Sequence, residues 1–271
     1  MEDALTDQEF ALFQRLIHDL AGISLSAGKK LLLVGRLSAR VEHHGCRSFG
    51  EYYQLLASGR HPDEVQRVVD LLTTHETYFF REARHFDFLR DTILPARRAT
   101  PQFRIWSAAC SSGEEAYSMA MVLAEHRPHA AWEVFASDIS RSVLAQAQEA
   151  CYALDRTRAI PPALLRRYCL KGVRSQTGKI LVGPELRERV TFARLNLTTA
   201  IGGVGTFDVT FLRNVMIYFD AETRRKVIDN MLPCLKPDGF FIVGHSESLT
   251  GITDRLRSAR PTIYRLAGED R

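Results

Sequence analysis

Residues 103–115 read FRIWSAACSSGEE, and an apolar pattern of helical period follows them directly. This stretch predicts a buried strand, then a loop of small residues, then a helix with two acidic residues in its first turn. Small side chains let a ligand lie against the loop backbone, and the unpaired N–H groups at the start of a helix attract polar groups. The stretch therefore predicts an α/β sheet with a ligand site at the carboxyl end of this strand.

A second apolar run, residues 132–137, ends in Asp138. In doubly wound sheets, an acidic residue at the tip of the second strand holds the ribose hydroxyls of a bound nucleoside. The alternative role for Asp138 is to cap the helix that we expect after it, because a carboxylate accepts hydrogen bonds from the free N–H groups of a helix start. Both interpretations remain open on the sequence.

The 271 residues are 45% hydrophobic and 25% charged, with a formal net charge of +4. These proportions are typical of a globular protein, and the net charge is too small to indicate nucleic acid as a partner. No apolar run approaches the roughly 18 residues of a membrane helix, and the N-terminal residues 1–4, MEDA, are acidic, unlike a signal peptide. We therefore expect a cytoplasmic protein.

The five cysteines are spread over the chain without a C-x-x-C pair. Their odd number and wide spacing predict reduced thiols and no metal site. Cys110 lies in the small-residue loop. We expect it to fill space there, because no histidine or lysine stands nearby in the sequence to activate its thiol.

The pattern of the chain changes near residue 90, which divides it into two predicted domains. Residues 1–90 show helical periodicity, beginning with a capping box at Thr6–Glu9. Residues 91–271 alternate strand and helix, which predicts a doubly wound, mostly parallel sheet whose last strand pairs antiparallel. The expected strands are 103–109, 132–137, 190–194, 207–212, 239–244 and 261–266, and the expected helices include 28–44, 48–58, 62–73, 114–126, 140–150 and 220–233.

Residues 168–183 do not fit this alternation. They form two short β-prone runs around a turn that is bounded by Gly172 and Gly178. Because the segment is too short to fold alone, we expect a small β-hairpin subdomain, inserted in the second domain and docked on its main sheet.

Five motifs stand along the chain in a fixed order: THETYFFRE (74–82), ACSSGEEAYS (109–118), FASDI (135–139), RNVMIYF (213–219) and GHSES (244–248). In order and spacing they resemble the CheR family of bacterial chemotaxis-receptor methyltransferases, over nearly the whole chain. The resemblance implies a class I methyltransferase sheet that binds S-adenosylmethionine and releases S-adenosylhomocysteine. The implied reaction is O-methylation of glutamate side chains on the cytoplasmic helices of chemoreceptors, a step of receptor adaptation in signal transduction.

The resemblance also implies a role for each residue that matches a family motif. His75, which stands where the family commonly has asparagine, would contact the methionine part of the cofactor together with Thr77 and Arg81. Glu115 would bind the amino group, and Asp138 would hold the ribose. The remaining roles fall to Asn196 and Leu197 beside the adenine, to Arg213 and Asn214 closing the pocket, and to the catalytic pair Arg81 and Tyr218 beside the methyl and the incoming carboxylate.

Few catalytic groups are needed for the implied reaction. A glutamate side chain, with an ordinary pKa of about 4.3, is already ionised at neutral pH, so methyl transfer to it requires no general base. We therefore assign no histidine as a base and expect His245 to make a structural hydrogen bond. The site would supply orientation and a dry pocket.

Two parts of the chain are candidate contacts for a receptor. Lys29, Arg36, Arg40 and His43 recur at helical spacing and share one face. A solvated surface is one interpretation of this face, and docking to an acidic receptor helix, as the resemblance implies, is the other. The resemblance also implies that a receptor C-terminal peptide can add a strand to the inserted subdomain. Arg174, which replaces a glycine of the tethering members, could then either block the added strand or bind the terminal carboxylate of the peptide, and we expect the second.

Other function classes share parts of this pattern. A nucleic-acid methyltransferase would have an Asn/Asp-Pro-Pro-Tyr/Phe tetrad where residues 214–217 read NVMI. A nicotinamide oxidoreductase would have the G-x-G-x-x-G fingerprint, which the sequence lacks. Methylation of another protein substrate, or nucleoside binding without turnover by a receptor adaptor, remains open. We expect a monomer that binds no nucleic acid and does not insert into a membrane.

Overall fold

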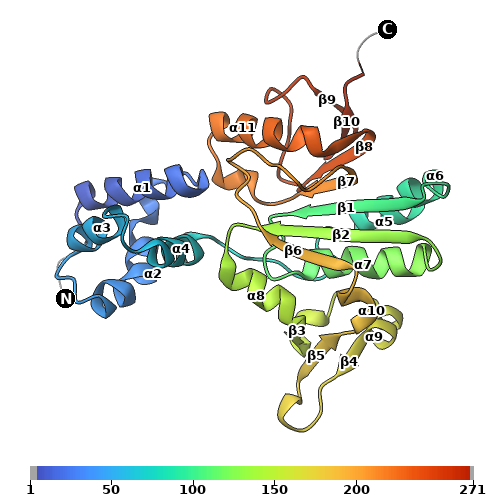
Figure 1. The fold of residues 1–271 in the computed structure, drawn as a ribbon, viewed down its shortest axis with the longest axis horizontal. Coiled ribbons are helices and arrows are strands. Elements are labelled where there is room, and N and C mark those ends of the chain that lie inside the picture. The colour runs from blue at the N-terminus through green and yellow to red at the C-terminus, as the bar shows by residue number, and fades with distance from the viewer. Residues whose placement is uncertain (1–4, 269–271) are drawn as a thin grey trace.

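The structure, a computed structural model, describes residues 5–268, so the acidic N-terminal residues 1–4 lie outside the described part of the chain. A helical bundle forms the N-terminal part, and a sheet flanked by helices forms the larger part (Figure 1). The helices of the bundle are α1 (Asp7–Ala21), α2 (Lys30–His43), α3 (Phe49–Ala57) and α4 (Pro62–Leu72), and a 3₁₀ turn, η1 (Ala27–Lys29), precedes α2.

Helix α1 begins at the predicted capping box. Thr6 Oγ1 accepts the N–H of Glu9 at 3.2 Å and Glu9 accepts the N–H of Thr6 at 2.8 Å, so the capping box is present. Gly22 ends the helix with a φ of 72°, a left-handed conformation that glycine adopts at little cost. On the apolar face of the helix, Phe13 and Ile17 are fully buried.

The main sheet contains seven strands among the described residues. In spatial order they are β6 (Val190–Arg194), β2 (Ala131–Asp138), β1 (Gln102–Ala108), β7 (Phe207–Leu212), β8 (Leu235–Val243), β10 (Ile263–Leu266) and β9 (Leu256–Arg260). The first five are parallel and β10 runs antiparallel to β8, which confirms the predicted class I sheet. Strand β9, at the edge beyond β10, was not predicted.

Adjacent residues of the central strands face opposite sides of the sheet. On β1, Trp106 belongs to the core shared with α11 (Ala221–Met231) and the helical bundle, whereas Ile105 belongs to the core shared with α7 (Glu114–His126). Both side chains are fully buried. Burial on both faces explains why these strands appear in the sequence as continuous apolar runs.

The order of the strands reverses between β1 and β7. From β1 the chain adds β2 and β6 in one direction, and it then adds β7 and β8 in the other. Open α/β sheets bind ligands at the carboxyl ends of the strands beside such a reversal. The loop 109–113 after β1, Asp138 at the end of β2 and Arg213 after β7 all lie at this edge.

Shorter elements complete the fold. The remaining helices are α5 (Arg84–Phe88), α6 (Leu94–Ala96), α8 (Arg141–Glu149), α9 (Pro162–Tyr168) and α10 (Pro184–Arg187), with a π-helical turn, η2 (Leu89–Ile93), between α5 and α6. The 3₁₀ turns are η3 (Leu154–Thr157), η4 (Arg174–Gln176), η5 (Met216–Tyr218) and η6 (Leu232–Cys234). Within residues 5–268, no helix is long and apolar enough to cross a membrane.

The inserted subdomain is a three-stranded antiparallel sheet, larger than the predicted hairpin. Strands β4 (Cys169–Lys171) and β5 (Lys179–Val182) form that hairpin, and β3 (Cys151–Ala153) pairs with the other side of β5. Its sheet is separate from the main one. Tyr152 of β3 packs edge-on against Tyr117 of α7, so the subdomain docks on a helix where we expected the sheet.

The turn of the subdomain requires glycine at one position and has arginine in a glycine-like conformation at another. A Cβ at Gly172 would lie 1.9 Å from the carbonyl oxygen of Gln176, so only glycine fits there. Arg174 has a φ of 54°, the left-handed region that glycine favours. The Arg174 side chain is exposed, so the backbone keeps a glycine-like shape while presenting a cation.

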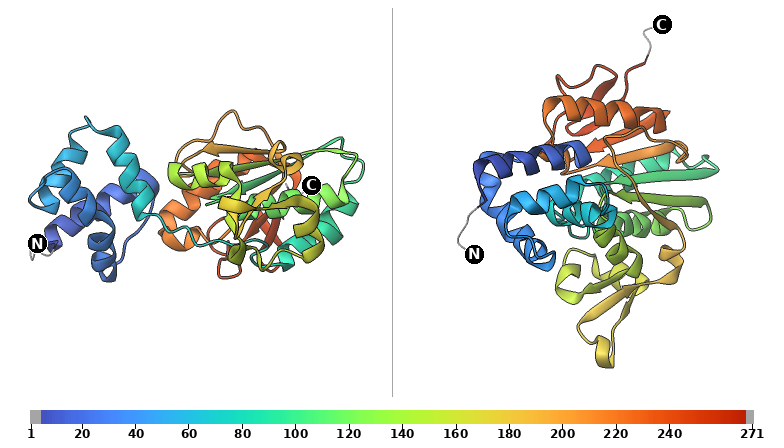
Figure 2. Two further views of the ribbon diagram at one scale, coloured as in Figure 1. Left: turned by 90° about the horizontal axis from the view of Figure 1, so that it is seen from below. Right: turned by 60° about the vertical axis from the view of Figure 1, so that its left-hand side comes forward.

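The helical bundle meets the sheet domain at the end of α1 and just after it. Ile23 forms an antiparallel bridge with Phe219, and Asn196 Nδ2 donates to the carbonyl oxygen of Leu20 at 2.8 Å. Figure 2 shows the bundle beside the sheet domain, with the segment after α4 crossing between them. The ligand edge of the sheet therefore lies next to the bundle.

Candidate functional site

A pocket of about 930 Å³, open to solvent, lies at the carboxyl edge of the sheet where it meets the bundle. Its walls come from the end of α1, the linker after α4, the loop after β1, and the segments after β2, β6 and β7. Every residue that the resemblance assigns to the cofactor or to catalysis lines it: His75, Thr77, Arg81, Glu115, Asp138, Asn196, Leu197, Arg213, Asn214 and Tyr218.

The loop after β1 has a strained backbone that brings it close to its neighbours. Ala109 and Ser111 have φ values of 60° and 50°, and Gly113 has a φ of 94°. A Cβ at Gly113 would lie 2.8 Å from the Cβ of Ala147, so this glycine allows α7 and α8 to approach each other. Cys110 is buried, and burial raises the pKa of its thiol well above the ordinary value, as expected for a space-filling residue.

Asp138 is anchored by the backbone around it. Its carboxylate accepts the N–H groups of Ser111 at 2.9 Å and of Ser140 at 3.0 Å. Ser140, not Asp138, is the N-cap of α8, because its hydroxyl accepts the N–H of Val143, so the helix-cap alternative for Asp138 is wrong. Burial raises the pKa of Asp138, although the backbone N–H groups oppose this effect. A carboxylate has about four acceptor sites, so the side chain retains capacity for a ligand.

Glu115 and Arg213 form an ion pair in the wall of the pocket. Arg213 Nη1 lies 2.9 Å from Glu115 Oε2, and Ser107 donates to Glu115 Oε1 at 2.6 Å. Burial raises the pKa of Glu115, and the charge of Arg213 acts in the opposite direction. The pair joins the end of β7 to the first turn of α7, so Arg213 positions the acid that we expect at the cofactor amino group.

Glu82 is a site residue that the sequence reasoning quoted but did not assign. Its carboxylate pairs with Arg213 Nη2 at 3.0 Å and accepts Asn214 Nδ2 at 3.1 Å and the N–H of His245 at 3.1 Å. Glu82 and Asn214 both have left-handed φ values, 57° and 59°. We expected His245 to make a structural hydrogen bond, and its backbone N–H makes one to Glu82.

Behind the pocket, Glu247 is a second acid that the sequence reasoning missed. Its carboxylate accepts backbone N–H groups from Asn214, Val215, Met216 and Gly244 at 2.8–3.0 Å. The side chain is buried. Glu247 therefore fixes the loop that carries Arg213, Asn214 and Tyr218. The GHSES motif contained it, but the motif alone does not reveal its backbone partners.

The linker after α4 supplies the opposite wall. His75 Nε2 lies 2.7 Å from Thr73 Oγ1, and Arg81 Nη1 donates to the carbonyl oxygen of Glu76 at 2.6 Å. The Arg81 guanidinium also lies over the ring of Tyr78, 5.8 Å from its centre. These contacts orient Arg81 along the linker, in the lining of the same pocket as Tyr218.

The inserted subdomain touches the site through Arg156. Its guanidinium pairs with Glu114, which is fully buried, and donates to Ser112 Oγ at 3.2 Å. Tyr152 Oη donates to the carbonyl oxygen of Ser112 at 2.7 Å. Both contacts hold the small-residue loop, so the subdomain helps to fix the shape of the pocket wall.

Of the four basic residues that we predicted to dock a receptor, two make contacts inside the protein and two are exposed. Arg36 Nη1 donates to the carbonyl oxygens of Leu72 and Thr73, each at 2.9 Å. Arg40 pairs with Glu64 through its Nε at 2.8 Å and its Nη2 at 2.5 Å. Both side chains thus hold the bundle and linker together. Lys29, in the turn η1, and His43 are exposed.

Comparison with known proteins identifies relatives over nearly the whole length of the chain. The family model "CheR methyltransferase, SAM binding domain" matches residues 75–265, and "CheR methyltransferase, all-alpha domain" matches residues 8–73. The chemotaxis protein methyltransferase of Escherichia coli (strain K12) is 41% identical over 267 residues, which cover 97% of this chain and 92% of the relative. That of Salmonella typhimurium is 39% identical over the same shares of the two chains, and chemotaxis protein methyltransferase 2 of Pseudomonas aeruginosa is 39% identical over 96% and 93%.

Proposed function

Because the chain belongs to the CheR family of chemotaxis methyltransferases that use S-adenosylmethionine, we propose that it methylates glutamate side chains on the cytoplasmic helices of chemoreceptors. The products are glutamyl methyl esters and S-adenosylhomocysteine. The chain acts in the cytoplasm. Residues 91–271 are the transfer domain, residues 1–90 and the subdomain at 168–183 contact the receptor, and the enzyme is a monomer.

The observation that carries the proposal is the composition of the pocket. Asp138 and Glu115 offer carboxylates to a diol and an ammonium group, and Leu197 offers an apolar surface to a base. These groups fit S-adenosylmethionine, which supplies an electrophilic methyl when bound. In the lining of the same pocket, Arg81 and Tyr218 offer a cation and a hydroxyl to an incoming carboxylate.

The pocket suits a nucleophile that needs no activation. A glutamate carboxylate attacks as the anion that it already is at neutral pH, so orientation is what the enzyme must supply. Arg81 guides the carboxylate, and its hydrogen bond to the linker backbone limits how tightly it can hold the anion. Tight binding of the ground state would slow the transfer.

Receptor docking rests on residues that the fold leaves exposed. Lys29 and His43 present a basic edge to an acidic receptor helix, whereas Arg36 and Arg40 support it from within. Lys29→Glu should raise the KM for receptor without lowering thermal stability, and added salt should reduce the effect because exposed charges are screened. Lys226→Glu, an exposed change on α11, is the matched control. Equal KM values for the two variants would remove the basic edge from the docking surface.

The subdomain provides a tether for receptors with a suitable C-terminal peptide. Strand β4 is an edge strand, and its Leu170 is 57% exposed, so backbone hydrogen bonds and an apolar contact are available to an added strand. Arg174 binds the peptide carboxylate. Amidation of the peptide should therefore weaken its binding to the parent but leave binding to Arg174→Gly unchanged. An equal loss of affinity in both proteins would show that Arg174 does not bind the peptide carboxylate.

The reaction is tested by incubating the full chain with methyl-labelled S-adenosylmethionine and a chemoreceptor cytoplasmic fragment. We expect label on the fragment that mild alkali releases as methanol, since esters hydrolyse and methylamines do not. Replacement of the modified glutamates by alanine should abolish labelling. Alkali-stable label would indicate another protein substrate or acceptor, and S-adenosylhomocysteine binding without any transfer would indicate an adaptor.

A further inference from the structure

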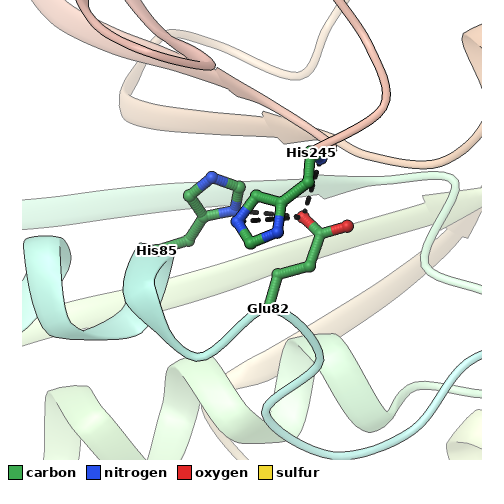
Figure 3. A group of neighbouring side chains, drawn as sticks. All are labelled: Glu82, His85 and His245. Atoms are coloured by element: carbon green, nitrogen blue, oxygen red, sulfur yellow. Dashed lines mark hydrogen bonds and ion pairs between the residues drawn. The ribbon is translucent and has the colours of Figure 1, made fainter.

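Glu82, His85 and His245 bring three metal-ligand side chains together beside the pocket (Figure 3). His85 Nδ1 lies 3.5 Å from Glu82 Oε2, and His245 Nε2 lies 3.9 Å from the same oxygen. The two imidazole rings are 4.9 Å apart between centres. Glu82, just before α5, and His85, in α5, are three residues apart in the sequence, and the fold brings His245 to them from the loop after β8.

One buried nitrogen of this cluster lacks a partner. The His85 side chain is 2% exposed, and its Nδ1 has no hydrogen-bond partner among residues 5–268. The Thr262 hydroxyl lies 2.8 Å from His85 Nε2 and 2.6 Å from the carbonyl oxygen of Pro261, so it can donate to Pro261 and accept from His85. In the neutral tautomer with its hydrogen on Nε2, the ring presents the lone pair of Nδ1 to the Glu82 carboxylate.

A lone pair facing a carboxylate in a buried site is unfavourable unless a cation or a proton lies between them. A ligating histidine typically donates its other N–H to a neighbouring group, and the Thr262 hydroxyl, 2.8 Å from His85 Nε2, can accept it. Ligands bound at about 2.1 Å in a tetrahedral site stand about 3.4 Å apart, close to the observed 3.5 Å between Glu82 and His85. The His245 side chain is half exposed, so its Nε2 can move from 3.9 Å to the shorter distance from Glu82 Oε2 that a shared ion requires.

We propose that Glu82 Oε2, His85 Nδ1 and His245 bind a divalent transition-metal ion of the zinc class, with water completing the coordination. This site lies beside the proposed transfer site, and the proposal does not depend on which acceptor is methylated. Two imidazoles and one carboxylate are a common zinc ligand set. The proposal departs from our prediction of no metal site, which rested on the cysteines alone.

Arg213 competes with the ion for the same oxygen. Its Nη2 lies 3.0 Å from Glu82 Oε2, which also accepts the N–H of His245. Each carboxylate oxygen has two lone pairs, so an ion must displace one of these donors. Since Arg213 also lines the cofactor pocket, bound metal and bound cofactor should weaken each other by the same factor.

Metal binding is tested on the full chain by calorimetry with Zn²⁺ and by visible absorption with Co²⁺. We expect one ion with a micromolar Kd and a four-coordinate cobalt spectrum without a thiolate charge-transfer band. His245→Ala should weaken binding at least about tenfold. The control His129→Ala removes another exposed histidine and should bind as the parent does. Equal affinity of His245→Ala and parent, a thiolate band, or no binding would overturn the site.

Competition is tested separately by titrating S-adenosylhomocysteine with and without saturating Zn²⁺. We expect a several-fold weaker affinity in the presence of the ion for the parent, and no change for His245→Ala. Equal affinities in the parent would overturn the competition with Arg213. Neither measurement requires a receptor or turnover, so a failure of the proposed glutamate methylation would leave both results interpretable.

Discussion

The carboxylate of Glu247 accepts the backbone N–H of Asn214 at 2.8 Å, which ties the loop after β8 to the loop after β7. Three further N–H groups converge on the same side chain. Hydrogen bonds to a charged acceptor are each worth about 1.5–3 kcal/mol. A single acid that does not itself line the pocket thus fixes the wall that carries Arg213 and Tyr218.

Glu247→Gln replaces one of the two acceptor oxygens by a donor. We expect the free energy of unfolding to fall by about 2 kcal/mol and methyl transfer to slow, because the loop after β7 loses its anchor. Denaturant unfolding and initial rates measure the two effects. Glu222→Gln, an exposed change on α11, should alter neither, and a Glu247→Gln protein with parental stability and rate would show that the loop holds its shape without this acid.

Asp138→Ala should weaken the binding of S-adenosylmethionine and S-adenosylhomocysteine alike. Loss of hydrogen bonds from ribose hydroxyls to a charged acceptor costs about 1.5–3 kcal/mol, or about 10- to 100-fold in Kd. Calorimetry with S-adenosylhomocysteine measures the change, and Asp155→Ala, an exposed change in η3, is the control. Unchanged affinity would remove Asp138 from the ligand contacts and leave it only the role of anchoring Ser111 and Ser140.

Tyr218→Phe separates chemistry from cofactor binding. Removing one hydroxyl beside the reacting carboxylate should reduce kcat about fivefold, equivalent to about 1 kcal/mol. The Kd for S-adenosylhomocysteine should stay at the parental value. Single-turnover methylation of a receptor fragment and calorimetry give the two numbers. A variant with parental turnover would contradict the position proposed for Tyr218 beside the methyl.

Acid should destabilise the helical bundle through Glu64. Although burial opposes the shift, hydrogen bonds from Arg40 and Tyr52 hold the pKa of Glu64 at about 2, compared with 4.5 for an ordinary glutamate. The stabilisation is therefore complete above about pH 4.5 and is lost as the pH falls toward 2, and it amounts to about 3 kcal/mol. Urea unfolding of parent and Glu64→Gln should differ most at pH 7 and least at pH 3. A constant difference across this range would mean that ionisation of Glu64 does not stabilise the fold.

Long periodic elements were predictable from local sequence. Helix α7 spans Glu114–His126, as predicted, because a small-residue loop, acids in the first turn and an apolar pattern all agree there. Strands β3 and β9 were missed. β3 has three residues, and four of the five residues of β9 are exposed, so neither shows the periodicity that burial imposes.

Side-chain partners that are distant in sequence were beyond prediction. The spacing of Arg36 and Arg40 correctly indicates a shared helix, but their acceptors lie on and after α4. Local charge alone cannot distinguish a solvated cation from one paired with another helix. The pocket residues were located because the resemblance supplied them together, whereas Glu82 and Glu247 act through backbone and side-chain partners that only the fold brings close.

The pocket lies across the seam between two folding units. Ala21 and Ile23 line it from the bundle, Thr73–Thr77 from the linker, and Asp138 from the sheet domain. A ligand that contacts all three parts adds its binding free energy to the contacts that keep the bundle docked. Cofactor occupancy should therefore make bundle and sheet domain melt as one cooperative unit, and loss of the cofactor should let the bundle swing from the domain that it covers.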